Sequence, residues 1–350
     1  MAPSPPCPQG TGEKLAAKFI VDYNRDNSAC PREDWLAAMA EADPFSDKLF
    51  VNIGANKGYN LAVWMNVFLP KLEVTPAVWN DSLARVLQNS GDCGVCQDCS
   101  ASFAVSPQRT PRIFASRAHL TMLAADLNCE NLQGIERVVG QIPALSSSLA
   151  TSPQAERLSL FTACAGLSNV QSRLTMTKCP FAHESCRIGE VVGRRTESVS
   201  VPITTADELL RLLLAQLPAH DPPAQEPQPA AAGSEEYRPL VDVLMVDTEG
   251  NDYLVLQGAQ QLLARRQVRV LIFEYHRFPP WGQYALAAVK DELAGLGFEC
   301  YFQGQGRLWR ITGEGCWSPR FEFHEWSNVM CVQRQDLWHQ TLQQFVVSAD

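Results

Sequence analysis

Apolar runs of strand length alternate along this chain with segments whose apolar residues recur at helical spacing. Two of the runs, 241–246 and 268–273, are broken only by Asp242 and Arg269 near their starts. Such nearly continuous apolar runs are typical of parallel strands that are covered on both faces. The alternation therefore predicts an α/β fold, with a mostly parallel sheet and helices on both of its faces.

The same patterns predict the individual elements. Strands are expected at 49–53, 112–115, 158–163, 199–203, 241–246, 268–273, 298–302, 308–311 and 328–332, with an antiparallel edge pair among the last of them. Helices are expected at 35–42, 59–69, 120–127, 209–214, between 246 and 268, and at 286–296. Thr205 and Glu208 form a capping-box pattern ahead of the leucine-rich helix.

The order of these elements predicts one large domain with additions. Residues 1–47 are interpreted as an N-terminal cover, residues 48–335 as the main domain, and residues 336–350 as a C-terminal tail. Apolar periodicity weakens over 71–111, where cysteines gather, and over 217–239, which is rich in Pro and Ala. We interpret both stretches as insertions, and the second as a flexible loop.

Charge and apolar content exclude several classes of protein. A formal net charge of -9 without a basic stripe argues against a main function in nucleic-acid binding, which needs clustered Lys and Arg. No run of about 18 apolar residues is present to cross a bilayer, and the N-terminus lacks the apolar stretch of a signal peptide. We therefore expect a soluble, cytoplasmic protein without a nucleic-acid partner.

Twelve cysteines are spread unevenly over the chain. Without a secretory signal, we expect thiols or a metal site rather than a disulfide scaffold. Cys93, Cys96 and Cys99 have the spacing with which thiolates converge on one Zn²⁺, and a structural zinc site, free thiols and a disulfide remain alternatives there. Cysteines in apolar surroundings are interpreted as small buried side chains: Cys129, Cys164, Cys300 and Cys331.

Polar side chains follow two of the apolar strands. Asp247 and Glu249 come directly after one strand, and Glu274 and His276 end the next. Open α/β sheets bind their ligands outside the carboxyl ends of parallel strands, so these four are the candidate catalytic residues. His276 or Glu249 is interpreted as a general base, while Asp247 and Glu274 shape the pocket or jointly hold a divalent cation.

A strand also enters a helix through the turn Gly54–Gly58. Glycines there let the backbone approach a ligand, and the N-terminus of the helix offers free N–H groups. The spacing differs from the dinucleotide-binding fingerprint, and similar turns occur as tight corners without a ligand. On its own, the turn is a weak indication of a ligand site.

Several segments, taken in order, resemble the FkbM-type S-adenosylmethionine-dependent methyltransferases. They are VNIGANKG, PITTADELL, VLMVDTEGNDYLVLQGA, LIFEYH and GFECYF. The resemblance implies a class I methyltransferase-like (Rossmann-like) sheet of seven strands with an antiparallel C-terminal strand, and methyl transfer to an oxygen. It also implies cofactor-binding roles for Asn52, Gly54, Asn56, Gly58 and Asp247, with Asn52 standing where the family usually has Asp.

The resemblance further implies an acidic residue that ends the second strand and holds the ribose of the cofactor. With that strand placed at 112–115, the chain reads FASR at its end and offers no carboxylate. The first interpretation is an S-adenosylmethionine-dependent O-methyltransferase that acts on a hydroxyl of a small metabolite, a glycan or a lipid-linked acceptor. The alternative is a catalytically inactive binding or scaffold protein of the same fold with a cysteine-rich metal-binding insertion; a nicotinamide-dependent oxidoreductase is a third, weaker one.

Overall fold

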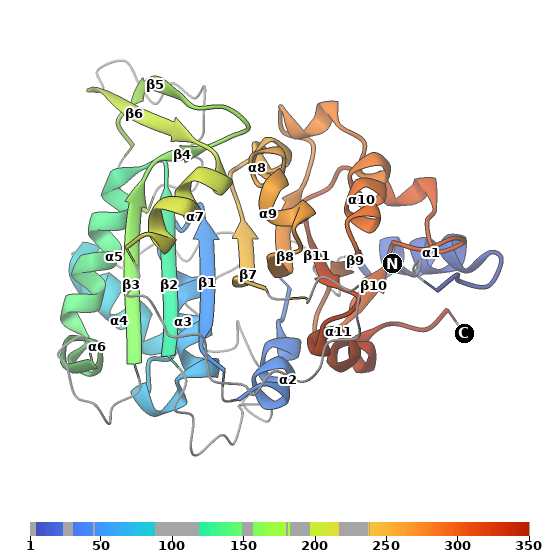
Figure 1. Cartoon of the computed structure of the whole chain (residues 1–350), viewed down its shortest axis with the longest axis horizontal. Coiled ribbons are helices and arrows are strands. Elements are labelled where there is room, and N and C mark those ends of the chain that lie inside the picture. The colour runs from blue at the N-terminus through green and yellow to red at the C-terminus, as the bar shows by residue number, and fades with distance from the viewer. Residues whose placement is uncertain are drawn as a thin grey trace.

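The computed structural model describes residues 5–23, 31–44, 46–87, 119–148, 157–179, 181–182, 197–216, 237 and 239–349. Their centre is a sheet of eight strands in the order β10-β9-β11-β8-β7-β1-β2-β3 (Figure 1). These strands are β1 (Lys48–Ile53), β2 (His119–Asp126), β3 (Arg157–Cys164), β7 (Val241–Val246), β8 (Val268–Tyr275), β9 (Phe298–Gln303), β10 (Leu308–Arg310) and β11 (Ser327–Gln333).

The pairing of the strands is mixed. β3, β2, β1, β7 and β8 pair in parallel, whereas β11 runs antiparallel to both β8 and β9. The predicted α/β class with a mostly parallel sheet is confirmed. The predicted number of seven strands is wrong, because β10 pairs antiparallel with β9 and extends that edge of the sheet by one strand.

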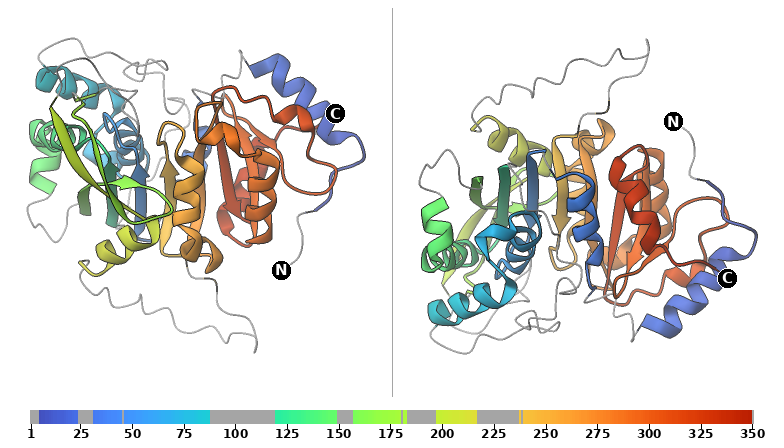
Figure 2. Two further views of the ribbon diagram at one scale, coloured as in Figure 1. Left: turned by 90° about the horizontal axis from the view of Figure 1, so that it is seen from above. Right: turned by 90° about the horizontal axis from the view of Figure 1, so that it is seen from below.

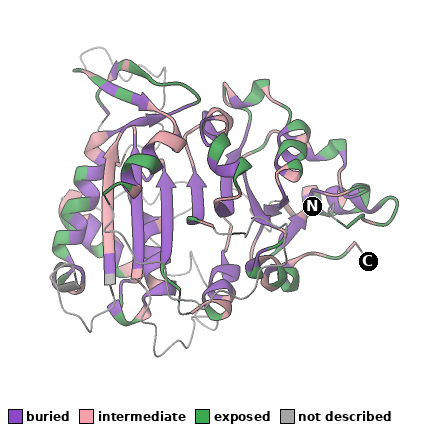
Figure 3. Ribbon diagram, viewed as in Figure 1, coloured by how far each residue is buried: buried purple, intermediate pink, exposed green. Residues whose placement is uncertain are grey.

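Helices cover both faces of the sheet and enclose two apolar cores (Figure 2). The first core lies under α2 (Asp34–Ala42), α3 (Tyr59–Phe68), α4 (Pro76–Leu87), α5 (Cys129–Gln141), α6 (Pro143–Ser148) and α11 (Leu337–Leu342). The second core lies under α1 (Thr11–Asp22), α7 (Ala206–Leu214), α8 (Asp252–Gly258), α9 (Gln260–Ala264) and α10 (Leu286–Gly295). The central strands are buried, and the exposed positions gather on the outer faces of the helices (Figure 3).

A second, small sheet lies beyond the carboxyl end of β3 (Figure 1). It contains β4 (Gly166–Leu167), β6 (Ser198–Thr204) and β5 (Ser172–Thr177) in that order.

The start of α7, the helix that follows β6, is fixed by its capping residue. The Thr205 hydroxyl accepts a hydrogen bond from the N–H of Glu208 at 3.2 Å, which begins α7 as the capping pattern predicts.

Some elements differ from the predictions. The helix predicted at 120–127 is wrong, because residues 120–126 belong to β2. This segment lies between β1 and β3, and its pairing with both outweighs its local spacing. The helix expected between β7 and β8 is divided into α8 and α9 at Ala259. The strand expected at 112–115 lies outside the described residues. Within 71–111, residues 76–87 form α4, whose Trp79 and Leu83 are buried in the first core.

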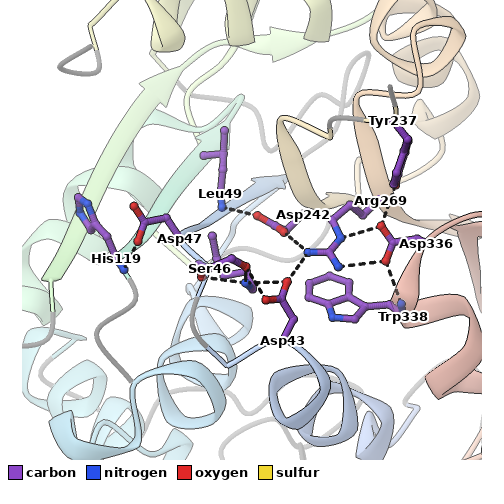
Figure 4. Close-up of polar contacts among 11 residues, drawn as sticks. Asp43, Ser46, Asp47, Leu49, His119, Tyr237, Asp242, Arg269, Asp336 and Trp338 are labelled. Carbon is purple, nitrogen blue, oxygen red and sulfur yellow. Dashed lines mark hydrogen bonds and ion pairs between the residues drawn. The ribbon is translucent and has the colours of Figure 1, made fainter. Parts of the chain in front are cut away.

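The polar breaks in the two central strands meet at the amino ends of those strands (Figure 4). Arg269 donates to both carboxylate oxygens of Asp336, at 2.9 and 3.0 Å, and to Asp43 and Asp242, each at 2.9 Å. Its guanidinium lies over the ring of Trp338, with Cζ 3.7 Å from the ring centroid. This network joins the end of α2, the starts of β7 and β8, and the start of α11.

The prediction of free thiols is wrong for the described cysteines. Cys7–Cys316, Cys129–Cys164 and Cys300–Cys331 form disulfides, and Cys179 is also disulfide-bonded. The fold brings these distant residues together, and no cysteine of the described part is free. No described helix is long and apolar enough to cross a membrane.

Candidate active site

The turn after β1 and the end of β7 are direct neighbours. The N–H of Asp247 donates to the carbonyl oxygen of Ile53 at 2.9 Å, which continues the pairing of the two strands. A Cβ at Gly54 would lie 1.6 Å from the carbonyl oxygen of Asp247, and Gly54 has a φ of 82°. Only glycine therefore fits here, because both the approach and the left-handed conformation exclude a side chain.

An acidic residue ends β2 beside the same turn. Asp126 Oδ2 accepts hydrogen bonds from the N–H of Asn56 at 2.8 Å and from the side chain of Asn131 at 3.2 Å. Its Oδ1 accepts from the N–H of Asn128 at 2.7 Å. Burial raises the pKa of Asp126, and these hydrogen bonds oppose that effect. The expectation that no carboxylate ends the second strand is therefore wrong, because the strand that pairs with β1 is His119–Asp126.

The polar residues at this edge share one face of the sheet. Residues of a strand point alternately to its two faces, and here the two faces belong to the two cores. Asn52, Asp126 and Glu274 each neighbour residues of the second core, so their side chains lie on the side of the first core. Asp247 directly follows a second-core residue of β7, and the same alternation places it with them.

Several buried polar atoms at this edge have no hydrogen-bond partner within the described part of the chain. Among them are Nδ2 and Oδ1 of Asn52, Oδ1 of Asn56 and Oγ1 of Thr248. Buried polar groups in folded proteins are nearly always hydrogen-bonded, to protein or to a bound molecule. These orphaned atoms, on both sides of Gly54, are therefore suited to holding a polar ligand.

A group of carboxylates surrounds the start of α8. Asp252 is completely buried and accepts hydrogen bonds from the N–H groups of Thr248, at 3.3 Å, and Gly250, at 3.2 Å. Burial and the charge of Asp247 raise the pKa of Asp252 to about 7. Burial, and then the charges of Asp247 and Asp252, raise the pKa of Glu274 well above its usual range. The edge therefore favours neutral carboxyls or a bound cation.

Glu274 lies between two aromatic neighbours, of which Trp326 is hydrogen-bonded to it. The indole N–H of Trp326 donates to Oε1 of Glu274, and Oε2 lies 3.7 Å from Nε2 of His276. The N–H of Phe278 donates to Nδ1 of His276 at 3.0 Å, so a neutral imidazole carries its proton on Nε2, toward Glu274. His276 thus faces Glu274 with a donor, and Glu274 is the better placed of the two to accept a proton from a ligand.

The structure places the other candidate residues as follows. Glu249 lies in the turn after β7 with a φ of 55°, and its charge contributes to the raised pKa of Glu274. Gly58 directly precedes α3, and a Cβ there would lie 2.7 Å from the ring of Trp79, so this glycine permits helix packing. The three cysteines of the predicted zinc site, Cys93, Cys96 and Cys99, lie outside the described residues. Within the described ranges, no group of three or more His, Cys, Asp or Glu side chains is arranged to hold a metal ion.

Sequence reasoning missed Asp126 and Trp326. Asp126 was available as a signal, since an acidic residue directly follows an apolar run and precedes Asn128, which caps α5. No local pattern identifies Trp326, because its contact with Glu274 joins residues that are 52 positions apart.

Part of this edge of the sheet belongs to a segment that matches a known protein family. Residues 231–300 match the family model of the methyltransferase FkbM domain. The resemblance is confirmed over this segment. The matched FkbM segment contains β7, the acidic turn with Asp247 and Glu249, and β8 with Glu274. It supports methyltransferase activity. No curated protein and no solved structure matches the chain.

Proposed function

We propose that the protein is an S-adenosylmethionine-dependent O-methyltransferase that acts on a hydroxyl of a small metabolite, a glycan or a lipid-linked acceptor. The observation that carries the proposal is the convergence of Gly54, Asp126 and Asp247 at one edge of the sheet. The FkbM match over the acidic turn supports the same activity. Bound S-adenosylmethionine supplies an electrophilic methyl group on a positively charged sulfur.

The chain offers a group for each polar part of that cofactor. Asp126 would accept hydrogen bonds from the ribose hydroxyls, as acidic residues at this position do in nucleotide-binding α/β folds. Asn52 and Asn56 provide the orphaned amide atoms on the two sides of Gly54. The carboxylates of Asp247 and Glu274 would offset the positive charge on the sulfur of the cofactor. That charge would in turn favour the ionised form of both side chains. We assign Gly58 to helix packing rather than to direct contact.

Glu274 is assigned the role of general base for the acceptor hydroxyl. Its raised pKa suits this role, since a base works best when its pKa lies near the working pH. Trp326 fixes one carboxylate oxygen, and His276 directs its Nε2 proton toward the other. This assignment replaces His276 as the base, because the lone pair of His276 Nδ1 already accepts from Phe278. It prefers Glu274 to Glu249 because Trp326 holds the carboxylate of Glu274 in place.

Two other expectations are not part of the proposal. The catalytically inactive alternative depended on the absence of a carboxylate at the end of the second strand, and Asp126 removes that reason. A cytoplasmic location is not retained either, because disulfides such as Cys7–Cys316 persist mainly in oxidising compartments.

Calorimetric titration tests the proposal. Saturable binding of S-adenosylmethionine and of its demethylated product S-adenosylhomocysteine is expected, with NAD as the comparison ligand. Glu274→Gln, which keeps the shape of the side chain, should still bind S-adenosylhomocysteine, which has no charge on sulfur, and should lose methyl transfer to a hydroxyl acceptor by about 10² to 10⁴-fold. A folded wild-type protein that binds neither adenosyl ligand, or that binds NAD instead, would exclude the proposal.

A further inference from the structure

We infer that the Cys129–Cys164 disulfide is a positioning element of the cofactor site, which holds the Asp126 carboxylate in place for the ribose. The inference rests on the proposed function. It assigns a role to two residues that touch neither the reacting atoms nor the acidic cluster. The disulfide is located where β2, β3 and α5 meet.

The two cysteines flank Asp126 in space. Cys164 ends β3 and is the direct cross-strand partner of Asp126 in the pairing of β2 with β3. Cys129 is the first residue of α5 and follows Asn128, the cap of that helix. Their Cα atoms are 5.1 Å apart. The disulfide therefore ties the start of α5 to the strand end beside Asp126.

The start of α5 supplies most of the hydrogen bonds that orient this carboxylate. Asn128 donates from its N–H at 2.7 Å and Asn131 from its side chain at 3.2 Å. The side-chain nitrogen of Asn128, Nδ2, also donates to Oδ1 of Asn131 at 3.1 Å, so the two donors are hydrogen-bonded to each other. Movement of the start of α5 away from β3 would disturb both donors together. Because Asp126 is buried, a small displacement of the start of α5 would leave the carboxylate oxygens without these donors. The carboxylate would then no longer be held in one orientation.

A second disulfide provides a matched control. Cys300 and Cys331 are cross-strand partners in β9 and β11, and they lie in the second core. Their separation in sequence is 31 residues, against 35 for Cys129 and Cys164. Since the effect of a disulfide on the unfolded chain depends on loop length, removal of either pair should cost a similar amount of stability. Only the first pair is next to Asp126.

The experiment compares the full chain with two double variants, Cys129→Ala/Cys164→Ala and Cys300→Ala/Cys331→Ala. Calorimetry gives the Kd for S-adenosylhomocysteine, and competition with adenosine and 2′,3′-dideoxyadenosine reports how strongly the ribose hydroxyls are recognised. Removal of the first pair should weaken binding about tenfold, the loss of one charge-assisted hydrogen bond. It should also abolish the preference for adenosine over the dideoxy compound. The control pair should keep both the Kd and the preference.

An unchanged preference for adenosine in the Cys129→Ala/Cys164→Ala protein would overturn the inference and leave the proposed function intact. The same loss in both variants would also overturn it, because a general loosening of the fold would then account for the effect. A wild-type protein that fails to bind S-adenosylhomocysteine overturns the proposed function and this inference with it. If the alanine pair does not fold, Cys129→Val/Cys164→Ala, which restores volume at the helix start, is measured in the same way.

Discussion

Carboxylates lie at both ends of the central strands, but an arginine pairs with them at one end, and they raise one another's pKa at the other. At the amino ends, Arg269 is bonded to Asp43, Asp242 and Asp336. At the carboxyl ends, the charges that act on Glu274 are those of other carboxylates, and its pKa is raised. Removing one partner of a buried ion pair destabilises a fold strongly, whereas carboxyls that raise one another's pKa are typical of functional sites.

The pKa values express this difference. At the amino ends, burial alone would raise the pKa of Asp43, but Lys48 and the hydrogen bonds from Arg269 and Ser46 outweigh it and lower the pKa to about 2. At the carboxyl ends, burial and Asp247 raise the pKa of Asp252 to about 7. The first arrangement is complete within the protein. The second becomes complete when a positive charge is bound.

The largest expected effect is on stability at the amino ends. Arg269→Met leaves Asp242 and Asp336 without their ion-pair partner, while Asp43 keeps Lys48. Breaking a buried ion pair from one side costs roughly 3 to 5 kcal/mol. Urea unfolding measures the loss. Arg211→Met, which removes an exposed pair with Glu208, should leave the free energy of unfolding nearly unchanged, because solvent screens exposed ion pairs. An equal effect of both variants would contradict the distinction between the two ends.

The next largest effect concerns the ribose carboxylate. Asp126→Asn keeps the size of the side chain but removes its charge, and one charge-assisted hydrogen bond is worth about 1.5 to 3 kcal/mol. The Kd for S-adenosylhomocysteine should therefore rise about tenfold to a hundredfold. Calorimetry on the folded variant checks this value. An unchanged Kd would remove Asp126 from the site.

A smaller effect concerns pH. A bound positive charge favours the ionised carboxylates, so binding of S-adenosylmethionine should release protons below the Asp252 pKa of about 7. Its affinity should then rise with pH as these carboxyls ionise, by up to about tenfold per unit for each proton released. S-adenosylhomocysteine has no charge on sulfur and should show a flatter profile. Identical profiles for the two ligands would place the sulfur away from these carboxylates.

The two ends should also differ in the sign of the pH dependence of stability. Asp252 has a raised pKa, so it lowers the stability of the fold as pH rises from about 4, where it ionises in the unfolded chain, to about 7. Asp43 has a lowered pKa, so its contribution is present above about 4 and is lost as pH falls toward 2. Asp252→Asn should remove the first dependence and Asp43→Asn the second, measured by urea unfolding across pH. A common direction for both would refute the comparison.

Much of the fold was predictable because the strands and helices have strong local patterns. The two central strands, the capped α7 and the strand before Gly54 all begin and end near the predicted residues. The β2 segment was misassigned because its apolar residues fit both periodicities, and only its position between β1 and β3 decides between them. Because of that error, Asp126 was not recognised as the acidic residue that ends the second strand of the sheet.

The site was predictable only in part, for a related reason. The rule that ligands bind at the carboxyl ends of parallel strands brings Asp247 and Glu274 to the same edge without any coordinates. The partners of these residues could not be predicted in the same way. Trp326 contacts Glu274, Asp336 contacts Arg269, and Cys129 pairs with Cys164, and each contact joins segments that no periodicity relates.

The most direct test of the central claim is a crystal structure of the protein with S-adenosylhomocysteine. The account predicts that the ribose hydroxyls contact Asp126, with the glycine turn at Gly54 beside the ligand and the carboxylates of Asp247 and Glu274 on the side of its sulfur. A ligand bound at the amino ends of the strands, or anywhere away from Asp126 and Gly54, would contradict the account.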